Sequence, residues 1–284
     1  MDSRTFLGLR ASHNPYRWSV ELTPGLCTGL GLMFGGCGLA AAISALEGTS
    51  GRQCVWATGQ YLSHAAVGEF LDVDVTLAVE GNATTQARAV CHVGNREILT
   101  VNAALGERAF ELSGQWEQFP FDVPRPEDCR PRPPRLPADD TIHSRTDQRV
   151  VKAREPEEMD GTPGDGRSIL WARIPEVLDG VDATALAVMG DFMPMGVGQA
   201  LGILGGGTSL DNTLRVVHLV PTEWVLCDIQ VHAVERGFGH GLVHLYAEDG
   251  TLLAIGSQSC MVRYWKDQDG KRLTVPAARG REEA

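Results

Sequence analysis

The sequence predicts an α+β protein made of two copies of one unit, in which an antiparallel sheet wraps around a single long apolar helix. Each half contains one long, almost uniformly apolar segment followed by four runs with strand-like alternation. A helix that is apolar on most sides must be buried, and the apolar face of a sheet can bury it. The halves also align at a constant spacing of 154 residues, which indicates a duplication. The aligned pairs are His64 and His218, Glu69 and Glu223, Asp74 and Asp228, and Asn95 and Asp249.

Composition places the chain among soluble globular proteins. Its 284 residues suffice for one large or two ordinary domains, and no uncharged apolar run is long enough to span a membrane. The formal net charge of −11, without a basic stripe, argues against nucleic acid as a partner. The N-terminal residues lack the apolar core of a signal peptide, and seven cysteines are scattered singly. Reduced thiols and a cytoplasmic location are therefore expected.

The first half begins with a strand at residues 17–22 and a glycine-rich loop. An alanine-rich helix is expected over residues 34–47, ended by Gly48 as a left-handed C-cap. Strands follow at residues 53–62, 69–79, 83–93 and 97–104. The last two are joined at Gly94-Asn95, a short turn typical of a hairpin in an antiparallel sheet.

A change of composition separates the halves. Seven of the fifteen prolines lie between Pro120 and Pro137, among charged residues. This composition predicts a linker that contributes nothing to a core. The predicted organisation is a first unit at residues 1–112, a linker at 113–167 and a second unit at 168–284.

The second half repeats the order of the first. A strand is expected at residues 171–176 and one apolar helix at 183–204, with Gly205 as its C-cap. Strands follow at 208–217, 223–234, 239–247 and 251–265, with a turn at Asp249-Gly250.

Three polar residues interrupt this apolar pattern. Asp191 is the single acid inside the second apolar helix, Ser209 stands at the start of a strand, and Gln258 interrupts the last strand. A structural interpretation exists for two of them: Asp191 as an N-cap after a break at Gly190, and Ser209 as a strand start. Asp211, Thr208 and Asn212 are expected to support the site or to begin the strand. The 154-residue spacing relates the three polar residues to Cys37, Val55 and Ala104, so one site per chain is expected.

The repeated unit is identified as the hotdog fold, and its tandem form resembles the double-hotdog acyl-CoA thioesterases of the bacterial thioesterase II type. The resemblance rests on Phe34-Gly35-Gly36 at the first helix, on Ser209-Leu210-Asp211, and on LLAIGSQSCMVR at the end of the second sheet. In that family an Asp, a Thr or Ser, and a Gln hold the hydrolytic water, which implies Asp191, Ser209 and Gln258 here. A gapless comparison places the family's Asp at Met189, and Asp191 is the only carboxylate on this helix.

The implied function is hydrolysis of fatty acyl-CoA to the free acid and CoA. A thioester needs little activation of its leaving group, so a water and a carboxylate base suffice. Met193, Met195 and Leu201 are expected to line an apolar acyl tunnel. Neither a cofactor nor a metal is expected, since His232, His240 and His244 have no convergent carboxylate or cysteine. The remaining partner expectation is a homo-oligomer, a dimer or larger. The expected substrate-binding residues are Gly35, Gly36, Gly190 and Met193.

Two alternatives stay open. The scaffold could bind an acyl chain or lipid without catalysis, or it could be a hotdog dehydratase. A dehydratase would be expected to offer a His–Asp or His–Glu pair on a helix, and neither long predicted helix contains histidine.

Overall fold

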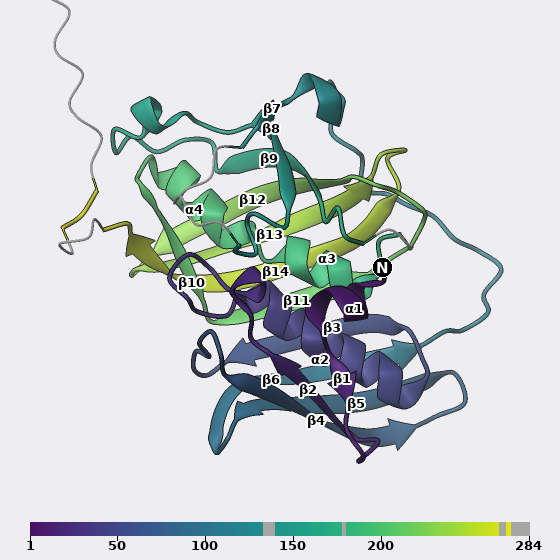
Figure 1. Cartoon of the computed structure of the whole chain (residues 1–284). Helices are drawn as coiled ribbons and strands as arrows, with labels where there is room; N and C mark the ends of the chain where they lie inside the picture. The colour runs from purple at the N-terminus through teal and green to yellow at the C-terminus, as the bar shows by residue number, and fades with distance from the viewer. Residues whose placement is uncertain (133–139, 178–179, 267–270, 274–284) are drawn as a thin grey trace, which may run out of the picture.

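The computed structural model describes residues 1–132, 140–177, 180–266 and 271–273. Within these residues the strands form one 14-stranded antiparallel sheet, with the helices on its inner face (Figure 1). The strand order is β1-β2-β4-β5-β6-β3-β11-β14-β13-β12-β9-β8-β7, and β10 pairs with β14 beside this path. The order reads as two five-stranded halves, β2-β4-β5-β6-β3 and β11-β14-β13-β12-β9, that meet edge to edge. This is the tandem hotdog arrangement that the sequence predicts.

The first unit contains the N-terminal helices and the purple-to-blue strands of Figure 1. Side chains facing α2, such as Val73, Ala89 and Val101, are fully buried, and they alternate with outward-facing polar residues. The elements are α1 (Ser3–Leu7), β1 (Arg10–Ala11), β2 (Arg17–Glu21), η1 (Pro24–Leu26), α2 (Gly35–Ser50), β3 (Cys54–Tyr61), β4 (Phe70–Glu80), β5 (Thr84–Val93) and β6 (Arg96–Gly106).

The predicted end of the first helix at Gly48 is wrong. Helix α2 continues to Ser50 and ends at Gly51, which has the left-handed φ of 68°. Gly48 lies inside the helix, and the Trp18 indole occupies the space beside it: a Cβ at Gly48 would meet the Trp18 ring at 2.5 Å. Packing, rather than capping, therefore explains this glycine.

The second unit repeats the layout with a divided helix. Its elements are β9 (Arg167–Arg173), α3 (Ala183–Gly190), α4 (Met193–Leu201), β10 (Gly205–Ser209), β11 (Asp211–Val216), β12 (Val225–Glu235), β13 (Phe238–Ala247) and β14 (Leu252–Tyr264).

The prediction of one continuous helix over residues 183–204 is wrong. The apolar segment breaks at Asp191 and Phe192, because Pro194 in the first turn of α4 has no N–H to continue the ladder of α3. The left-handed cap is Gly202, with a φ of 65°, instead of Gly205, which begins β10. The single strand predicted at 208–217 is likewise two strands, interrupted at Leu210.

The two units join where β3 and β11 pair antiparallel at the centre of the sheet. Thr58 and Thr213 face each other there, with their hydroxyl oxygens 2.7 Å apart. Helix α2 packs against α3 across this junction, on the inner face of the sheet (Figure 1). The ends of the two central helices, and any polar residue at those ends, therefore lie at the boundary between the units.

The 154-residue spacing does not hold to the last strand. Val75 pairs with Ala89 as Ile229 pairs with Val243, which preserves the spacing over β4, β5 and their repeats. Ala89 then pairs with Val101, whereas Val243 pairs with Gly256, a spacing of 155. The β13–β14 turn is one residue longer than the β5–β6 turn. On the corrected register the counterparts of Ser209 and Gln258 are Cys54 and Ala103, instead of Val55 and Ala104.

The segment between the units is more than a linker. It contains η2 (Pro126–Asp128), β7 (Arg130–Pro131), β8 (Asp147–Lys152) and η3 (Pro156–Glu158), and β8 extends the sheet by pairing with β9. Cys129 and Ile142 are buried, so the prediction that this segment contributes nothing to a core is wrong. Part of it, residues 133–139, lies outside the described residues, as does the end of the predicted second unit. The unit boundaries at 112 and 167 stay a prediction.

The same segment covers the outer face of the second half of the sheet. Phe119 packs against Tyr246 with ring centroids 5.4 Å apart and against Trp171 at 6.3 Å. The Trp171 indole donates to the Pro124 carbonyl at 2.9 Å, and the Tyr246 hydroxyl donates to the Gln118 carbonyl at 3.1 Å. A second apolar cluster thus forms on this face. Across the described residues, no helix combines the length and apolarity required to cross a bilayer.

Candidate active site

Asp191 occupies the break between α3 and α4, at the boundary of the two units. Its backbone N–H closes α3, and its side chain is 6% exposed. The carboxylate does not cap α4, whose N-cap is Phe192 without a side-chain hydrogen bond. Instead, Oδ2 of Asp191 accepts the Gly36 N–H at 2.7 Å, in the first turn of α2 from the other unit. The interpretation of Asp191 as the N-cap of its own helix is therefore wrong.

Oδ1, the second carboxylate oxygen, meets three side chains from neighbouring strands. Gln258 on β14 donates its amide Nε2 to this oxygen, and Ser209 and Asn212 contact it at 3.4 Å. Gln258 Nε2 also donates to Ser209 Oγ at 2.8 Å. The three residues singled out from the sequence thus form one hydrogen-bonded cluster, to which Asn212 is added.

Burial dominates the electrostatics of this carboxylate. It raises the pKa of Asp191 to about 6, while hydrogen bonds from Gln258, Gly36, Ser209 and Asn212 oppose the rise. The 16-residue helix α2 points its N-terminus at the carboxylate, and its dipole stabilises the charged form. The result is an acid that changes protonation near neutral pH, which suits a general base.

Close packing explains the glycine pair that opens α2. A Cβ at Gly36 would lie 2.9 Å from both the Ala187 carbonyl oxygen and Asp191 Cβ, and a Cβ at Gly35 would lie 2.8 Å from Asp191 Oδ2. Gly190 is different: its Cβ would meet only Leu214 and Leu245 at ordinary van der Waals distances, 3.6 Å and 4.0 Å. The close approach belongs to the first helix alone.

Aromatic rings surround the cluster on the helix side. Phe34, immediately before α2, packs against Phe192, immediately after Asp191, with centroids 6.2 Å apart. His143, from the segment between the units, contacts the Phe34 ring edge at 5.7 Å. Both phenylalanines are buried, and they help to remove the carboxylate from water.

Two residues of the site were missed or underrated in the sequence. The Tyr61 hydroxyl, on the last residue of β3, donates to the Gly35 carbonyl at 2.8 Å and so fixes the start of α2. Burial and the nearby Asp191 raise the pKa of Tyr61 well above its ordinary value, so it stays a neutral donor. Asn212 was expected only in a supporting or strand-start role. Tyr61 could not be identified from either unit considered alone, because its place in the site depends on the pairing of β3 with β11.

Asp211 lies apart from this cluster. Successive residues of a strand face opposite sides, and the Asp211 carboxylate accepts the Ser259 N–H at 2.8 Å on the outer face of the sheet. Asp211 therefore does not support Asp191. Met193, expected to bind substrate, is fully buried beside Gly241, 3.1 Å from the position of a Cβ there.

The equivalent position of the first unit is apolar. The counterparts of Ser209, Asn212 and Gln258 on the corrected register are Cys54, Ala57 and Ala103, all buried. Cys37, which the 154-residue spacing relates to Asp191, is buried as well. The polar side chains at Asp191, Ser209, Asn212 and Gln258 thus come from the second unit, and Gly35, Gly36 and Tyr61 of the first unit complete the site.

Fold and site together define a tandem hotdog protein in which acid, amide and hydroxyl groups meet in a largely buried cluster. The profile of the acyl-CoA thioesterase C-terminal domain matches residues 126–262. A solved structure of a candidate thioesterase from Novosphingobium aromaticivorans is 31% identical, with a TM-score of 0.78 over 90% of this chain and 98% of that one. The chain therefore belongs to the acyl-CoA thioesterase family with the double-hotdog fold.

More distant structures share the fold. A hotdog protein of unknown function from Alicyclobacillus acidocaldarius is 17% identical, with a TM-score of 0.78 over 92% of this chain and 97% of that one. An acyl-CoA thioesterase II from Mycobacterium marinum is 18% identical, with a TM-score of 0.69 over 92% of this chain and 98% of that one. Among curated proteins, none matches the chain.

Proposed function

We propose that the protein hydrolyses fatty acyl-CoA thioesters with a water activated by Asp191. The observation that carries this proposal is the cluster of buried Asp191 and Gln258 with partly buried Ser209, joined by hydrogen bonds in otherwise apolar surroundings. A buried carboxylate is costly unless it is hydrogen-bonded, and its raised pKa has no structural benefit. Family membership makes thioester hydrolysis the first chemistry to consider.

Each group has a distinct role in the proposed reaction. The ionised Asp191 takes a proton from the water as the water oxygen attacks the thioester carbonyl, and the CoA thiolate leaves from the tetrahedral intermediate. Ser209 and Gln258 orient the water, and Gln258 Oε1 offers it an acceptor, since this buried oxygen has no hydrogen-bond partner within the described chain. Asn212 holds the carboxylate in place.

The developing oxyanion needs a donor that Asp191 does not already use. The Gly36 N–H is engaged by the carboxylate. The Gly35 N–H stands at the first position of α2, where a helix leaves its N–H groups without intrahelical acceptors. We therefore assign the Gly35 amide, with the dipole of α2 behind it, to the oxyanion.

The acyl chain is expected along α4, beside Met193, Met195 and Leu201. Methionine side chains are flexible and readily change rotamer, so an entering alkyl chain can displace them. The dehydratase alternative is less favoured, because the Asp191 carboxylate is hydrogen-bonded by amides and a hydroxyl instead of the imidazole that such a pair requires.

A panel of acyl-CoA substrates, assayed for released thiol, tests the proposal. Asp191→Asn keeps the size and most hydrogen bonds of the side chain but cannot accept the proton, so turnover should fall by about 10²–10⁴-fold with KM little changed. Wild-type-like turnover in Asp191→Asn would refute Asp191 as the base. Binding of acyl-CoA without any thiol release from the wild type would favour the non-catalytic binder.

A further inference from the structure

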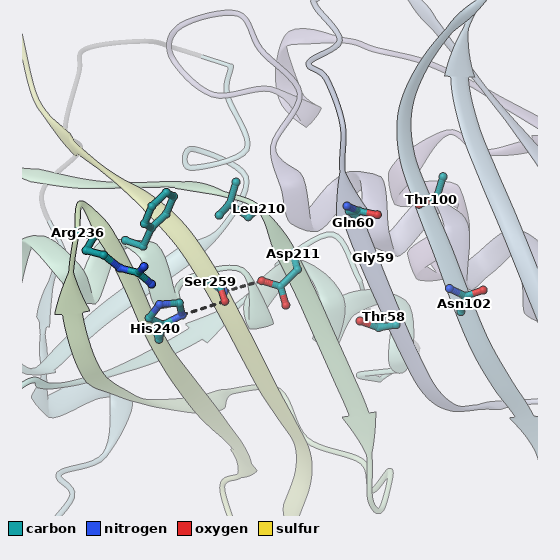
Figure 2. A pocket seen from close by; sticks show the side chains of 11 residues that line it. Thr58, Gly59, Gln60, Thr100, Asn102, Leu210, Asp211, Arg236, His240 and Ser259 are labelled. Atoms are coloured by element: carbon teal, nitrogen blue, oxygen red, sulfur yellow. Dashed lines mark hydrogen bonds between the residues drawn. The ribbon is translucent and has the colours of Figure 1, made fainter.

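A polar groove of about 570 Å³ crosses the outer face of the sheet at the junction of the two units (Figure 2). Its first-unit side is lined by uncharged hydrogen-bonding side chains from β3 and β6. These are Thr58, Gln60, Thr100 and Asn102. None of the residues assigned to the hydrolysis lines this groove.

The second-unit side carries the charges. Arg236, in the β12–β13 hairpin, lies exposed at the groove, and its guanidinium has no ion-pair or hydrogen-bond partner anywhere in the described part of the chain. Its φ of 52° is unusual for a residue other than glycine, so the hairpin holds this position at some conformational cost. Beside it, His240 contacts Ser259 Oγ through Nδ1 at 3.1 Å. The Asp211 carboxylate also lines the groove, where the Ser259 N–H binds it (Figure 2).

The groove and the Asp191 cluster approach each other at one point, through neighbouring residues on opposite faces. Gln258 points inward and Ser259 outward, and Tyr61 and Gln60 alternate in the same way. The backbone pairing between the units ends where the Tyr61 N–H donates to the Leu210 carbonyl at 2.9 Å. On the other side of Leu210, strand β10 pairs with β14 and not with β3. A flexible arm that passes the end of this ladder would connect the two faces.

We propose that this groove binds the coenzyme half of the substrate, the pantetheine arm and phosphorylated nucleotide of CoA. The proposal rests on the proposed function. The amide and hydroxyl side chains can hydrogen-bond the amides of pantetheine. The unpaired Arg236, with His240, can bind the phosphates of the coenzyme. Phe238, 37% exposed at the groove, offers a ring for the adenine base. On a chain with a net charge of −11, phosphates require such a local cation.

The kinetic test compares one acyl group on two carriers. The substrates are an acyl-CoA and the same acyl group on N-acetylcysteamine, which lacks the nucleotide. Arg236→Ala should raise the KM for acyl-CoA about tenfold and Arg236→Glu further, without changing the values for the short thioester. The control is Arg215→Ala, an exposed arginine on β11 that lies outside the groove and should leave both substrates unaffected. A matched thermal midpoint for each variant excludes a folding defect.

A binding measurement separates this proposal from the proposed hydrolysis. Calorimetric titration with free CoA should show weaker binding to Arg236→Glu than to the wild type, whether or not the protein cleaves thioesters. If Arg236→Glu loses CoA binding while the wild type does not hydrolyse thioesters, the proposed hydrolase function is refuted and the groove remains the CoA site. Unchanged CoA affinity in Arg236→Glu, no CoA binding by the wild type, or equal losses with both thioesters would overturn the groove assignment.

Discussion

The Asp191 carboxylate accepts the Gly36 N–H at 2.7 Å, across the boundary between the two units and 155 positions along the chain. This bond ties the acid of the second unit to the helix start of the first. The polar cluster is therefore a property of the paired units, and neither unit builds it alone. Changes in the first unit are expected to affect chemistry that the second unit supplies.

The pH dependence of activity should follow the pKa of Asp191, which burial raises to about 6. Only the ionised carboxylate can accept a proton, so turnover should rise between about pH 5 and about pH 7 and then level off. The rise should disappear in Asp191→Asn, measured over the same range of buffers. A flat wild-type profile, or a profile that falls through this range, would contradict the assignment.

Stability should change with pH in the opposite direction. The pKa of this group is higher in the folded chain than in the unfolded chain, where an aspartate titrates near about 3.9. The stabilisation is therefore fully present below the unfolded pKa and is lost as pH rises through the folded value of about 6. Asp191→Asn removes this dependence, so its thermal midpoint should improve relative to the wild type between about pH 4 and about pH 7.

The two polar partners of Asp191 should contribute unequally. Gln258 donates both to the carboxylate and to Ser209, whereas Ser209 contacts the carboxylate at 3.4 Å. Ser209→Ala removes a water-positioning hydrogen bond, typically about 1–3 kcal/mol, and should lower turnover about tenfold. Gln258→Ala should fall between Ser209→Ala and Asp191→Asn. Ser257→Ala, on the outer face of the same strand, is the matched control and should keep wild-type turnover.

The glycines beside Asp191 should differ in their tolerance of a methyl group. At Gly36 a Cβ would lie 2.9 Å from backbone and from Asp191, so Gly36→Ala must displace α2 from the carboxylate. We expect a loss of about 1–3 kcal/mol in stability and a lower turnover. Gly190→Ala meets its nearest atom at 3.6 Å and should keep the thermal midpoint or raise it. Equal effects of the two substitutions would show that the Gly36 contact is unimportant.

Much of the fold could be predicted from the sequence because apolar periodicity and turn residues are local signals. The strands of both halves of the sheet and the turns at Gly94 and Gly250 follow those signals. The end of α2 does not, because Gly48 is set by contact with Trp18, a residue distant in sequence. The break at Asp191 depends on Pro194, whose effect an apolar count does not register.

The site could be predicted as a set of residue types but not as an arrangement. Asp191, Ser209 and Gln258 stand out as polar residues in apolar surroundings, and the structure brings them together. Asn212 and Tyr61 do not stand out, since their positions depend on the pairing of β3 with β11. The alignment of the two units was also not fixed by the sequence pattern. One extra residue in the β13–β14 turn shifts the first-unit counterpart of every later residue by one position.

The segment between the units gives the last prediction, because its composition suggested a linker and its contacts show a structural role. Phe119 lies against Tyr246 and Trp171 on the outer face of the second half of the sheet. Phe119→Ala removes the ring that covers this cluster and should lower stability by about 2–4 kcal/mol, less than for a fully buried phenylalanine. Trp116→Ala is the matched control: this large aromatic side chain, three residues earlier, is 88% exposed and should contribute little. Urea unfolding of both variants measures the difference, and thiol release at a temperature where both are folded should stay near wild type. A Phe119→Ala variant as stable as Trp116→Ala would mean that the segment only lies on the sheet and does not stabilise it.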